Sequence, residues 1–199
     1  MSPGCRSTPE AVRRRPAVVL LDRDGVINAD SPEHIRSAAD WQPLPGSLAA
    51  IARLHEADIP VAVCTNQSGL ARGLFGHADL AAIHQRMEGA IDEAGGALAG
   101  VFVCPHGPDA GCDCRKPRPG LLLRALETLA VPPHQAAFVG DSARDVAAAE
   151  AAGVEPILVR TGNGRETAAA WPWPVATFDD LGMAVAALLE RPREHDHGD

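Results

Sequence analysis

Residues 17–28 read Ala-Val-Val-Leu-Leu-Asp-Arg-Asp-Gly-Val-Ile-Asn and place two aspartates directly after an apolar run. A short run of valine and leucine is typical of a buried strand, and the glycine that follows marks a sharp exit from it. Asp22 and Asp24 would then point into the crevice where open α/β sheets bind ligands. One carboxylate can attack an electrophile while the other handles a proton. Taken alone, the same letters fit a solvated Asp-Gly turn equally well.

Strand-like and helix-like segments alternate along the chain after this first strand. Short apolar runs indicate further strands, which we expect at residues 60–64, 100–103, 136–139, 156–159 and 175–178. Helical apolar spacing and helix-start residues indicate helices between them, at residues 45–54, 77–94, 119–129, 142–152 and 181–189. Regular β/α alternation predicts an α/β fold, a doubly wound parallel sheet with helices on both faces.

The alternation contains no internal repeat and no insertion large enough to form a folded cap. We therefore expect a single, capless, Rossmann-like domain over residues 16–191. Disordered tails are expected at residues 1–15 and 192–199.

The composition is that of a soluble globular protein, with 46% hydrophobic and 22% charged residues among 199. Lysine and arginine number 18 against 26 acidic residues, and the net charge of −8 argues against a nucleic-acid partner. A phosphorylated small molecule is compatible with this charge, because local basic groups and a cation can dominate one cleft. No apolar run approaches the roughly 20 residues that span a bilayer, and no secretory signal is found. The sequence thus indicates a cytoplasmic protein without membrane contact.

Three further polar motifs stand at predicted strand ends or in the loops that feed them. The second predicted strand ends in Thr65-Asn66-Gln67-Ser68-Gly69, and the fourth ends in Gly140-Asp141-Ser142-Ala143-Arg144-Asp145. Arg115-Lys116-Pro117 precedes a predicted helix. Each motif alone fits a cap or a tight turn better than a functional site. Together, and in this order, they converge on one edge of a parallel sheet, which predicts a site.

The converging residues fit phosphoryl transfer to water. Asp22 would attack phosphorus to give an aspartyl-phosphate, and Asp24 would protonate the leaving oxygen and then activate water. Asp22, Asp141 and the main-chain carbonyl of Asp24 would hold Mg²⁺, a hard cation that prefers oxygen ligands. The Thr65 hydroxyl would bond phosphate oxygens, and the Lys116 ammonium would neutralise charge that develops on them.

A cluster of cysteine and histidine follows the third predicted strand. It has the pattern Cys-x-His-x5-Cys-x-Cys and comprises Cys104, His106, Cys112 and Cys114. Four such ligands close together suit tetrahedral Zn²⁺, and a set without an open position indicates a structural metal. The zinc would hold this loop in one conformation and so fix the positions of Arg115 and Lys116, which follow its last ligand. The alternatives are a flexible loop with incidental thiols or a redox-active Cys-x-Cys pair.

The four motifs resemble those of the haloacid-dehalogenase superfamily of phosphatases. The superfamily's DxDG motif, strand-end Ser or Thr, Lys and terminal Asp pair match Asp22/Asp24, Thr65, Lys116 and Asp141/Asp145. The cysteine and histidine pattern is similar to that of the capless branch with a zinc loop. That branch holds heptose 1,7-bisphosphate 7-phosphatases and histidinol phosphatases.

Within the branch, residues 65–73, 112–117 and 160–162 are similar to the heptose enzymes. The resemblance implies removal of the 7-phosphate of D-glycero-D-manno-heptose 1,7-bisphosphate in lipopolysaccharide core precursor synthesis, with catalytic Mg²⁺ and structural Zn²⁺. Substrate contacts are implied for Asn66, Gln67, Ser68, Arg115 and Ser142. Of these, Arg115 would meet the second phosphate or the sugar. Residues 30–33 would also face the sugar, and Asp145 would position Lys116 or its loop.

Two other classes of function stay open at this point. One is histidinol phosphatase or another small phosphomonoesterase, such as a polynucleotide 3′-phosphatase, which fits the net charge of −8 poorly. The other is a zinc-stabilised binding module, which would leave both aspartates of the first motif idle. We expect a monomeric enzyme whose substrate is a small phosphorylated sugar. Four histidines enter none of these mechanisms and are expected at the surface or on a helix face: His34, His55, His77 and His84.

Overall fold

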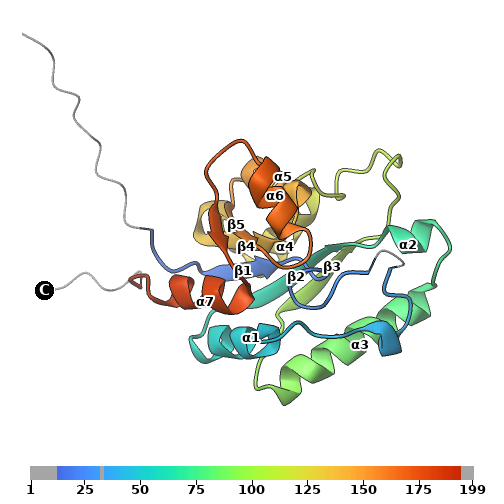
Figure 1. The fold of residues 1–199 in the computed structure, drawn as a ribbon, viewed down its shortest axis with the longest axis horizontal. Coiled ribbons are helices and arrows are strands. Elements are labelled where there is room, and N and C mark those ends of the chain that lie inside the picture. The colour runs from blue at the N-terminus through green and yellow to red at the C-terminus, as the bar shows by residue number, and fades with distance from the viewer. Residues whose placement is uncertain (1–12, 32–33, 194–199) are drawn as a thin grey trace, which may run out of the picture.

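Six parallel strands form the centre of the computed structural model, which describes residues 13–31 and 34–193 (Figure 1). Their order across the sheet is β3-β2-β1-β4-β5-β6. The strands are β1 (Val18–Leu21), β2 (Val61–Asn66), β3 (Gly100–Cys104), β4 (Ala136–Gly140), β5 (Glu155–Val159) and β6 (Ala176–Phe178). The α-helices are α1 (Ser47–Glu56), α2 (Ser68–Ala71), α3 (His77–Glu93), α4 (Gly120–Leu129), α5 (Ala143–Ala152), α6 (Gly164–Ala170) and α7 (Leu181–Leu189). Two 3₁₀ turns are η1 (Ala38–Asp40) and η2 (Pro133–Gln135). In these described ranges, no helix is both long and apolar enough to cross a membrane.

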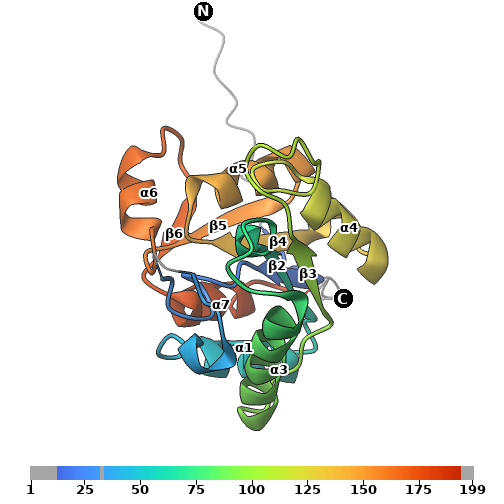
Figure 2. The same cartoon turned by 90° about the vertical axis from the view of Figure 1, so that its right-hand side faces the viewer.

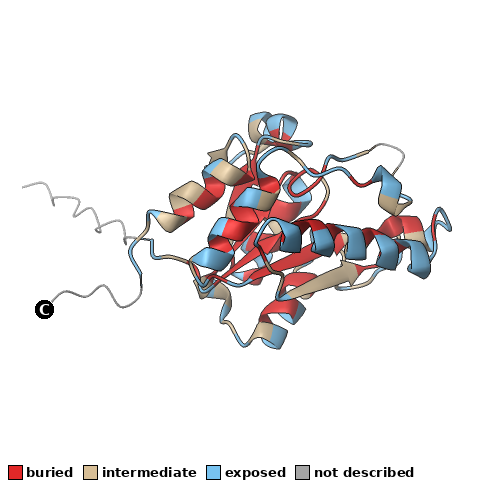
Figure 3. Cartoon of the chain, turned by 90° about the horizontal axis from the view of Figure 1, so that it is seen from below, coloured by how far each residue is buried: buried red, intermediate tan, exposed pale blue. Residues whose placement is uncertain are grey.

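Side chains of the central strands alternate between two cores, as the period of two in a strand requires. In β1, Val19 and Leu21 pack with apolar residues of α1, α3 and α7. Val18 and Leu20 pack instead with apolar residues of α4 and α5. Figures 1 and 2 show these helices as two layers on opposite faces of the sheet, and Figure 3 shows the buried strands between them. The predicted doubly wound parallel sheet is confirmed.

Two short helices were not predicted from the sequence. The first, α2, is a single turn with the sequence Ser-Gly-Leu-Ala, and it begins two residues after the end of β2. The second, α6, reads Gly-Arg-Glu-Thr-Ala-Ala-Ala, and its buried residues are Gly164 and Thr167. Neither segment has a helical stripe of large apolar side chains, so the periodicity that indicates a helix is missing. Gly164 brings α6 against β5, because a Cβ there would lie 1.6 Å from the carbonyl oxygen of Val159.

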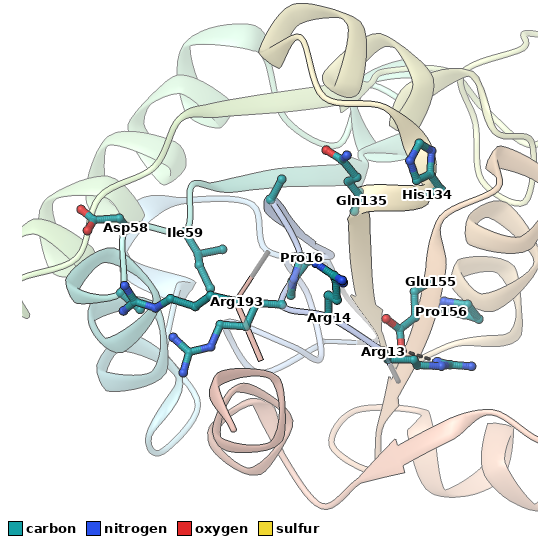
Figure 4. Close-up of a pocket in the computed structure, with 14 residues that line it drawn as sticks. Arg13, Arg14, Pro16, Asp58, Ile59, His134, Gln135, Glu155, Pro156 and Arg193 are labelled. Atoms are coloured by element: carbon teal, nitrogen blue, oxygen red, sulfur yellow. Dashed lines mark hydrogen bonds and ion pairs between the residues drawn. The ribbon is translucent and has the colours of Figure 1, made fainter. Parts of the chain in front are cut away.

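A hollow of 620 Å³ lies where the strands begin, at the edge opposite the predicted site (Figure 4). Arginines from both ends of the described chain line it. Two of these, Arg13 and Arg15, bond to other parts of the domain. Arg13 pairs with Glu155, which also accepts hydrogen bonds of 2.7 and 2.9 Å from Arg191. Arg15 donates to the main-chain oxygens of Arg191 and Leu189 at the end of α7.

The two expected tails fall mostly on residues 1–12 and 194–199, which lie outside the described residues. Arg13 and Arg15, at the end of the expected N-terminal tail, contact the domain through the bonds just given. The main-chain N–H of Arg15 also donates to Pro192 at 3.0 Å. The packed part of the chain therefore includes these residues.

Candidate active site

The polar motifs meet where the strand order reverses. β1 lies between β2 and β4, and the later strands are added on both sides of it, β2 and β3 on one side and β4 to β6 on the other. Asp22 follows β1, Thr65 lies near the end of β2, and Asp141 follows β4. Leu21 is level with Val139 in the sheet, which brings Asp22 beside the end of β4. Open α/β sheets bind their ligands in the crevice at such a switch point.

The ammonium of Lys116 lies between two buried carboxylates. Its Nζ is 2.9 Å from Oδ2 of Asp22 and 2.7 Å from Oδ1 of Asp145. Asn66 fixes the lysine's main chain: its Oδ1 accepts from Lys116 N at 3.2 Å, and its Nδ2 donates to Lys116 O at 3.1 Å. A lysine from a loop is thereby held against Asp22. Asn66, for which a substrate contact was expected, is engaged with the backbone of Lys116.

Asp145 is held by the first turn of α5. Its Oδ2 accepts a hydrogen bond of 3.0 Å from the main-chain N–H of Ser142, and the Ser142 hydroxyl donates to the same oxygen. Ser142 stands at the N-cap of the helix and Asp145 three residues later, which is the reciprocal arrangement of a capping box. Ser142, also expected to contact substrate, is buried and uses its hydroxyl within the protein.

The buried charges of the site do not balance. Burial raises the pKa of Asp22 to about 7; Lys116 opposes this rise, and Asp145 and Asp141 add to it. Burial also raises the pKa of Asp141 to about 6. Burial acts against the charge of Lys116, but Asp145 and Asp22 raise its pKa above the ordinary value, so the side chain is an ammonium. Three buried carboxylates thus share one buried ammonium, and the surplus of negative charge favours a bound cation.

One oxygen of Asp141 is free to bind a cation. Its Oδ2 accepts hydrogen bonds of 2.8 and 3.1 Å from the main-chain N and the Nδ2 of Asn163. Its Oδ1 is buried and has no hydrogen-bond partner among the described residues. Carboxylate oxygens of Asp22, Asp141 and Asp145 lie within 4.8 Å of one another. An unsatisfied buried oxygen destabilises a fold, so this donor set fits a hard cation such as Mg²⁺.

Two glycines allow the close packing around Asp141. Gly25 has a φ of +82° and Gly162 a φ of +53°, and a Cβ on either would lie 2.2 Å from Asp141 Oδ2. Residues with side chains rarely adopt such φ values, and the contact distance excludes a Cβ. The glycine of the first motif therefore makes room for the carboxylate that follows β4, besides ending β1.

Asp24 does not belong to the group of three carboxylates and is bound by donors on both of its oxygens. Arg23 donates through Nε to Oδ1 and through Nη2 to Oδ2, both at 3.0 Å. Asn28 donates to Oδ1 at 2.9 Å, and Gln67 donates to Oδ2 at 3.1 Å. The same Gln67 nitrogen lies 2.9 Å from the Thr65 hydroxyl oxygen. Gln67, expected to contact substrate, thus links Asp24 to Thr65.

The cysteine and histidine cluster assembles in the loop between β3 and α4. The Sγ atoms of Cys104 and Cys112 are 3.8 Å apart, and Nδ1 of His106 is 3.7 Å from Cys104 Sγ and 3.3 Å from Cys114 Sγ. All four ligand atoms lie within 4.8 Å of one another. Tetrahedral zinc with Zn–S bonds of about 2.3 Å separates two sulfurs by about 3.8 Å. The cluster therefore has the dimensions of a four-ligand zinc site.

Arg115 and Ser68 are the remaining predicted substrate contacts. Arg115 is half-buried, and its Nη1 donates to the carbonyl of His106 at 3.2 Å, so the cysteine and histidine loop orients it. Ser68 is buried at the start of α2. In the segment expected to face the sugar, Asp30 accepts a bond of 3.3 Å from Asn163, and residues 32–33 lie outside the described residues.

Comparison with known proteins identifies the family of this chain. A family model described as HAD-hydrolase-like matches residues 113–184. The D-glycero-β-D-manno-heptose-1,7-bisphosphate 7-phosphatases of Pseudomonas aeruginosa and Bordetella bronchiseptica are 48% and 49% identical to it, over 87% of this chain and 98% of each relative. The chain belongs to this family of haloacid-dehalogenase-like phosphatases.

Solved structures of the phosphatase family share the fold. The crystal structure of D,D-heptose 1,7-bisphosphate phosphatase from B. bronchiseptica, complexed with magnesium and phosphate, has a TM-score of 0.84 at 49% identity. The match covers 86% of this chain and 97% of that one. The corresponding enzyme from Burkholderia thailandensis has a TM-score of 0.71 at 38% identity and covers 87% of this chain and 99% of its own.

Three residues around the phosphatase site were not predicted from the sequence. Arg23 and Asn163 hold Asp24 and Asp141, respectively, through the bonds given above. His84 lies on helix α3, in line with the expected helix-face position, and it is half-buried, with Nε2 3.4 Å from Nη1 of Arg23. The position of Arg23 between two predicted catalytic aspartates was a usable signal. His84 and Asn163 gave none, because their contacts join segments far apart in the chain.

Proposed function

We propose that this chain removes the 7-phosphate of D-glycero-β-D-manno-heptose 1,7-bisphosphate, the reaction that names its relatives in P. aeruginosa and B. bronchiseptica. The observation that carries the proposal is the buried Asp22–Lys116 ion pair beside the unpartnered oxygen of Asp141. A carboxylate nucleophile, a fixed cation and an oxygen site for a metal are what phosphoryl transfer requires. We further propose a monomeric, cytoplasmic enzyme that serves lipopolysaccharide core precursor synthesis.

The proposed reaction has two steps. First, an Asp22 oxygen attacks phosphorus, the bond from phosphorus to O7 of the sugar breaks, and Asp24 gives O7 its proton. Second, Asp24 takes a proton from water as the water oxygen attacks phosphorus. The bond to Asp22 then breaks, inorganic phosphate leaves, and both aspartates return to their starting states. The Lys116 ammonium and the Thr65 hydroxyl stabilise charge on the phosphoryl oxygens in both steps.

Mg²⁺ is the cation proposed for the group of carboxylates. Side-chain oxygens of Asp22 and Asp141 and the main-chain carbonyl of Asp24 would hold it. When bound, the ion neutralises charge on the transferred phosphoryl group. The unpartnered oxygen of Asp141 supports this assignment, as does the magnesium in the B. bronchiseptica relative.

Stabilisation by Mg²⁺ is expected to increase with pH. The pKa of Asp22 is about 7 and that of Asp141 about 6, both above the ordinary 3.8. The native metal-free protein therefore holds protons that the unfolded chain has released, and its stability falls as pH rises through this range. Mg²⁺ replaces those protons, so the rise in Tm on adding it should be small at about pH 5 and large at about pH 8.

Thermal unfolding with and without Mg²⁺ measures this effect. Asp141→Asn should remove most of the Mg²⁺-dependent rise in Tm. Asp92→Asn, which changes an exposed carboxylate on α3, is the matched control and should retain it. A rise in Tm that does not vary with pH would contradict the placement of the cation on Asp22 and Asp141.

Structural Zn²⁺ is proposed for Cys104, His106, Cys112 and Cys114. Metal analysis should find about one zinc per chain. Cys112→Ser should lose the metal, lower Tm and reduce activity, because the loop that orients Arg115 would loosen. Cys64→Ala, at a buried cysteine of β2 outside the cluster, should keep the zinc. Zinc-free protein in which the three thiols of the cluster titrate as free would refute the assignment.

Arg115 is proposed to recognise the second phosphate or the sugar hydroxyls of the substrate. A guanidinium can contact a phosphate through two N–H groups. The heptose bisphosphate has a second phosphate that could make this contact, and histidinol phosphate has only one phosphate. Arg115→Ala should lower kcat/KM for the bisphosphate by about 10- to 150-fold, as expected for one charge-assisted contact, and much less for an aryl phosphate. Arg53→Ala, at an exposed arginine of α1, is the control. Equal losses on both substrates would exclude this role.

The test of the proposed function is a comparison of substrates. We expect a higher kcat/KM for the heptose bisphosphate than for histidinol phosphate, measured as phosphate release in the presence of Mg²⁺. A preference for histidinol phosphate would overturn the substrate assignment. Absence of hydrolysis of any phosphate monoester would favour a binding module instead of an enzyme.

A further inference from the structure

Arg23 has no role in the reaction as proposed above, although it lies between the two aspartates of the first motif. Its side chain is fully buried. A buried guanidinium destabilises a fold unless it is paired, so its contacts are the reason that it can be there. N–H···O bonds of 3.0 Å from its Nε and Nη2 join it to Oδ1 and Oδ2 of Asp24, a bidentate contact of the kind that arginine forms with carboxylates.

His84 supplies a contact on the other edge of the guanidinium. Its Nε2 lies 3.4 Å from Nη1 of Arg23. Burial lowers the pKa of His84 to about 4, and the charge of Arg23 contributes to this fall. The ring is therefore neutral at neutral pH, and a neutral imidazole nitrogen can accept a hydrogen bond from the arginine. Arg23 is thus fixed at one end by the first motif and at the other by α3.

The contacts of Arg23 determine where the Asp24 carboxylate lies. Asn28 and Gln67 each add one bond to Asp24, but among residues 13–31 and 34–193 only Arg23 bonds both of its oxygens. A planar fork that meets two oxygens fixes the plane of the carboxylate as well as its position. Proton transfer to a leaving oxygen depends on such placement, because a small displacement of the acid lowers the rate steeply.

We propose that Arg23, held by His84, is a positioning residue that sets the orientation of Asp24 for proton transfer to the leaving oxygen. This inference rests on the proposed function, in which Asp24 is the general acid. Loosening Arg23 should therefore affect the step in which the leaving group departs. It should matter most for a leaving group that needs a proton.

Two substrates separate this role from a merely structural one. A sugar alkoxide needs protonation as it leaves, whereas p-nitrophenolate leaves readily without it. Because kcat/KM reports the steps up to departure of the leaving group, it isolates the first proton transfer. Arg23→Lys should lower kcat/KM for the heptose bisphosphate by about 10- to 100-fold and change that for p-nitrophenyl phosphate by less than about threefold. In the Asp24→Asn background, Arg23→Lys should cause no further loss on the bisphosphate.

His84 provides a second set of variants should Arg23→Lys fail to fold. His84→Leu removes the hydrogen-bond acceptor of Arg23. It should lower kcat/KM for the heptose bisphosphate by about three- to tenfold and leave kcat/KM for p-nitrophenyl phosphate unchanged. His84→Gln keeps an acceptor and should restore the rate. His77→Leu, at an exposed histidine of the same helix, is the matched control and should behave as the wild type on both substrates.

The outcomes distinguish this inference from the proposed function. If Asp24→Asn lowers kcat/KM equally for both substrates, Asp24 is not the general acid. The part of the proposed function that rests on Asp24 is then wrong. If Asp24→Asn lowers kcat/KM mainly for the bisphosphate, but the Arg23 and His84 variants lower it equally for both substrates, the positioning role is overturned. An additional loss from Arg23→Lys in the Asp24→Asn background would overturn it as well.

Discussion

Asp22→Asn is expected to lower kcat by at least about 10⁴-fold, because an amide cannot replace the carboxylate as the attacking group. The change preserves the shape of the side chain and removes one charge from a group in which three buried carboxylates share one ammonium. The variant should therefore fold with a Tm close to that of the wild type. Steady-state phosphate release with p-nitrophenyl phosphate, together with thermal unfolding, measures both quantities.

Acid-quenched reactions with a radiolabelled phosphate substrate extend this test. Wild-type protein should carry acyl-phosphate label during turnover, and the Asp22→Asn variant should carry none. Asp24→Asn is the matched comparison, because it removes the proton carrier and leaves the nucleophile; its kcat should fall by about 10²–10⁴-fold. Near-normal turnover by Asp22→Asn would eliminate the covalent mechanism.

Lys116→Met is expected to reduce both stability and activity. The ammonium lies 2.9 Å from Asp22 and 2.7 Å from Asp145, so its loss leaves two buried carboxylates without their cation. Removing one partner of a buried ion pair lowers the free energy of unfolding by about 3–5 kcal/mol. Phosphoryl transfer should also fall, because no other buried ammonium faces Asp22 among the described residues. Chemical denaturation and phosphate release measure the two effects.

A double variant separates the two contributions of Lys116. Lys116→Met combined with Asp145→Asn removes one of the carboxylates that the lysine had neutralised. It should recover part of the lost stability without recovering activity. Recovery of both together would mean that Lys116 acts only by supporting the fold, and its proposed part in phosphoryl transfer would have to be abandoned.

Much of the fold was predictable because its signals are local. The apolar run before Asp22 and the alternation of strands with helices can be recognised without knowledge of distant contacts. The observed sheet is parallel and has helices on both faces, as predicted. The helix α6 was missed because it buries Gly164 and Thr167 and not a stripe of large apolar side chains. Its position depends on how closely Gly164 can approach β5, which only the assembled sheet determines.

The site was predictable at the level of which residues converge and not at the level of what each one contacts. Strand ends in a parallel sheet meet at one edge, so the meeting of Asp22, Thr65 and Asp141 followed from topology. Substrate contacts are predicted for Asn66 and Ser142, and the structure adds contacts of their side chains with Lys116 and Asp145 that the sequence did not indicate. Such a contact forms only where the fold brings a partner to the side chain, and for Asn66 that partner lies in a loop fifty residues away.

The most direct test of the proposed reaction is ³¹P NMR of D-glycero-β-D-manno-heptose 1,7-bisphosphate during incubation with the protein and Mg²⁺. We expect the 7-phosphate resonance to disappear, inorganic phosphate to appear in equal amount, and the anomeric 1-phosphate resonance to persist. Loss of the 1-phosphate, or an unchanged bisphosphate under conditions in which histidinol phosphate is hydrolysed, would contradict the proposed function.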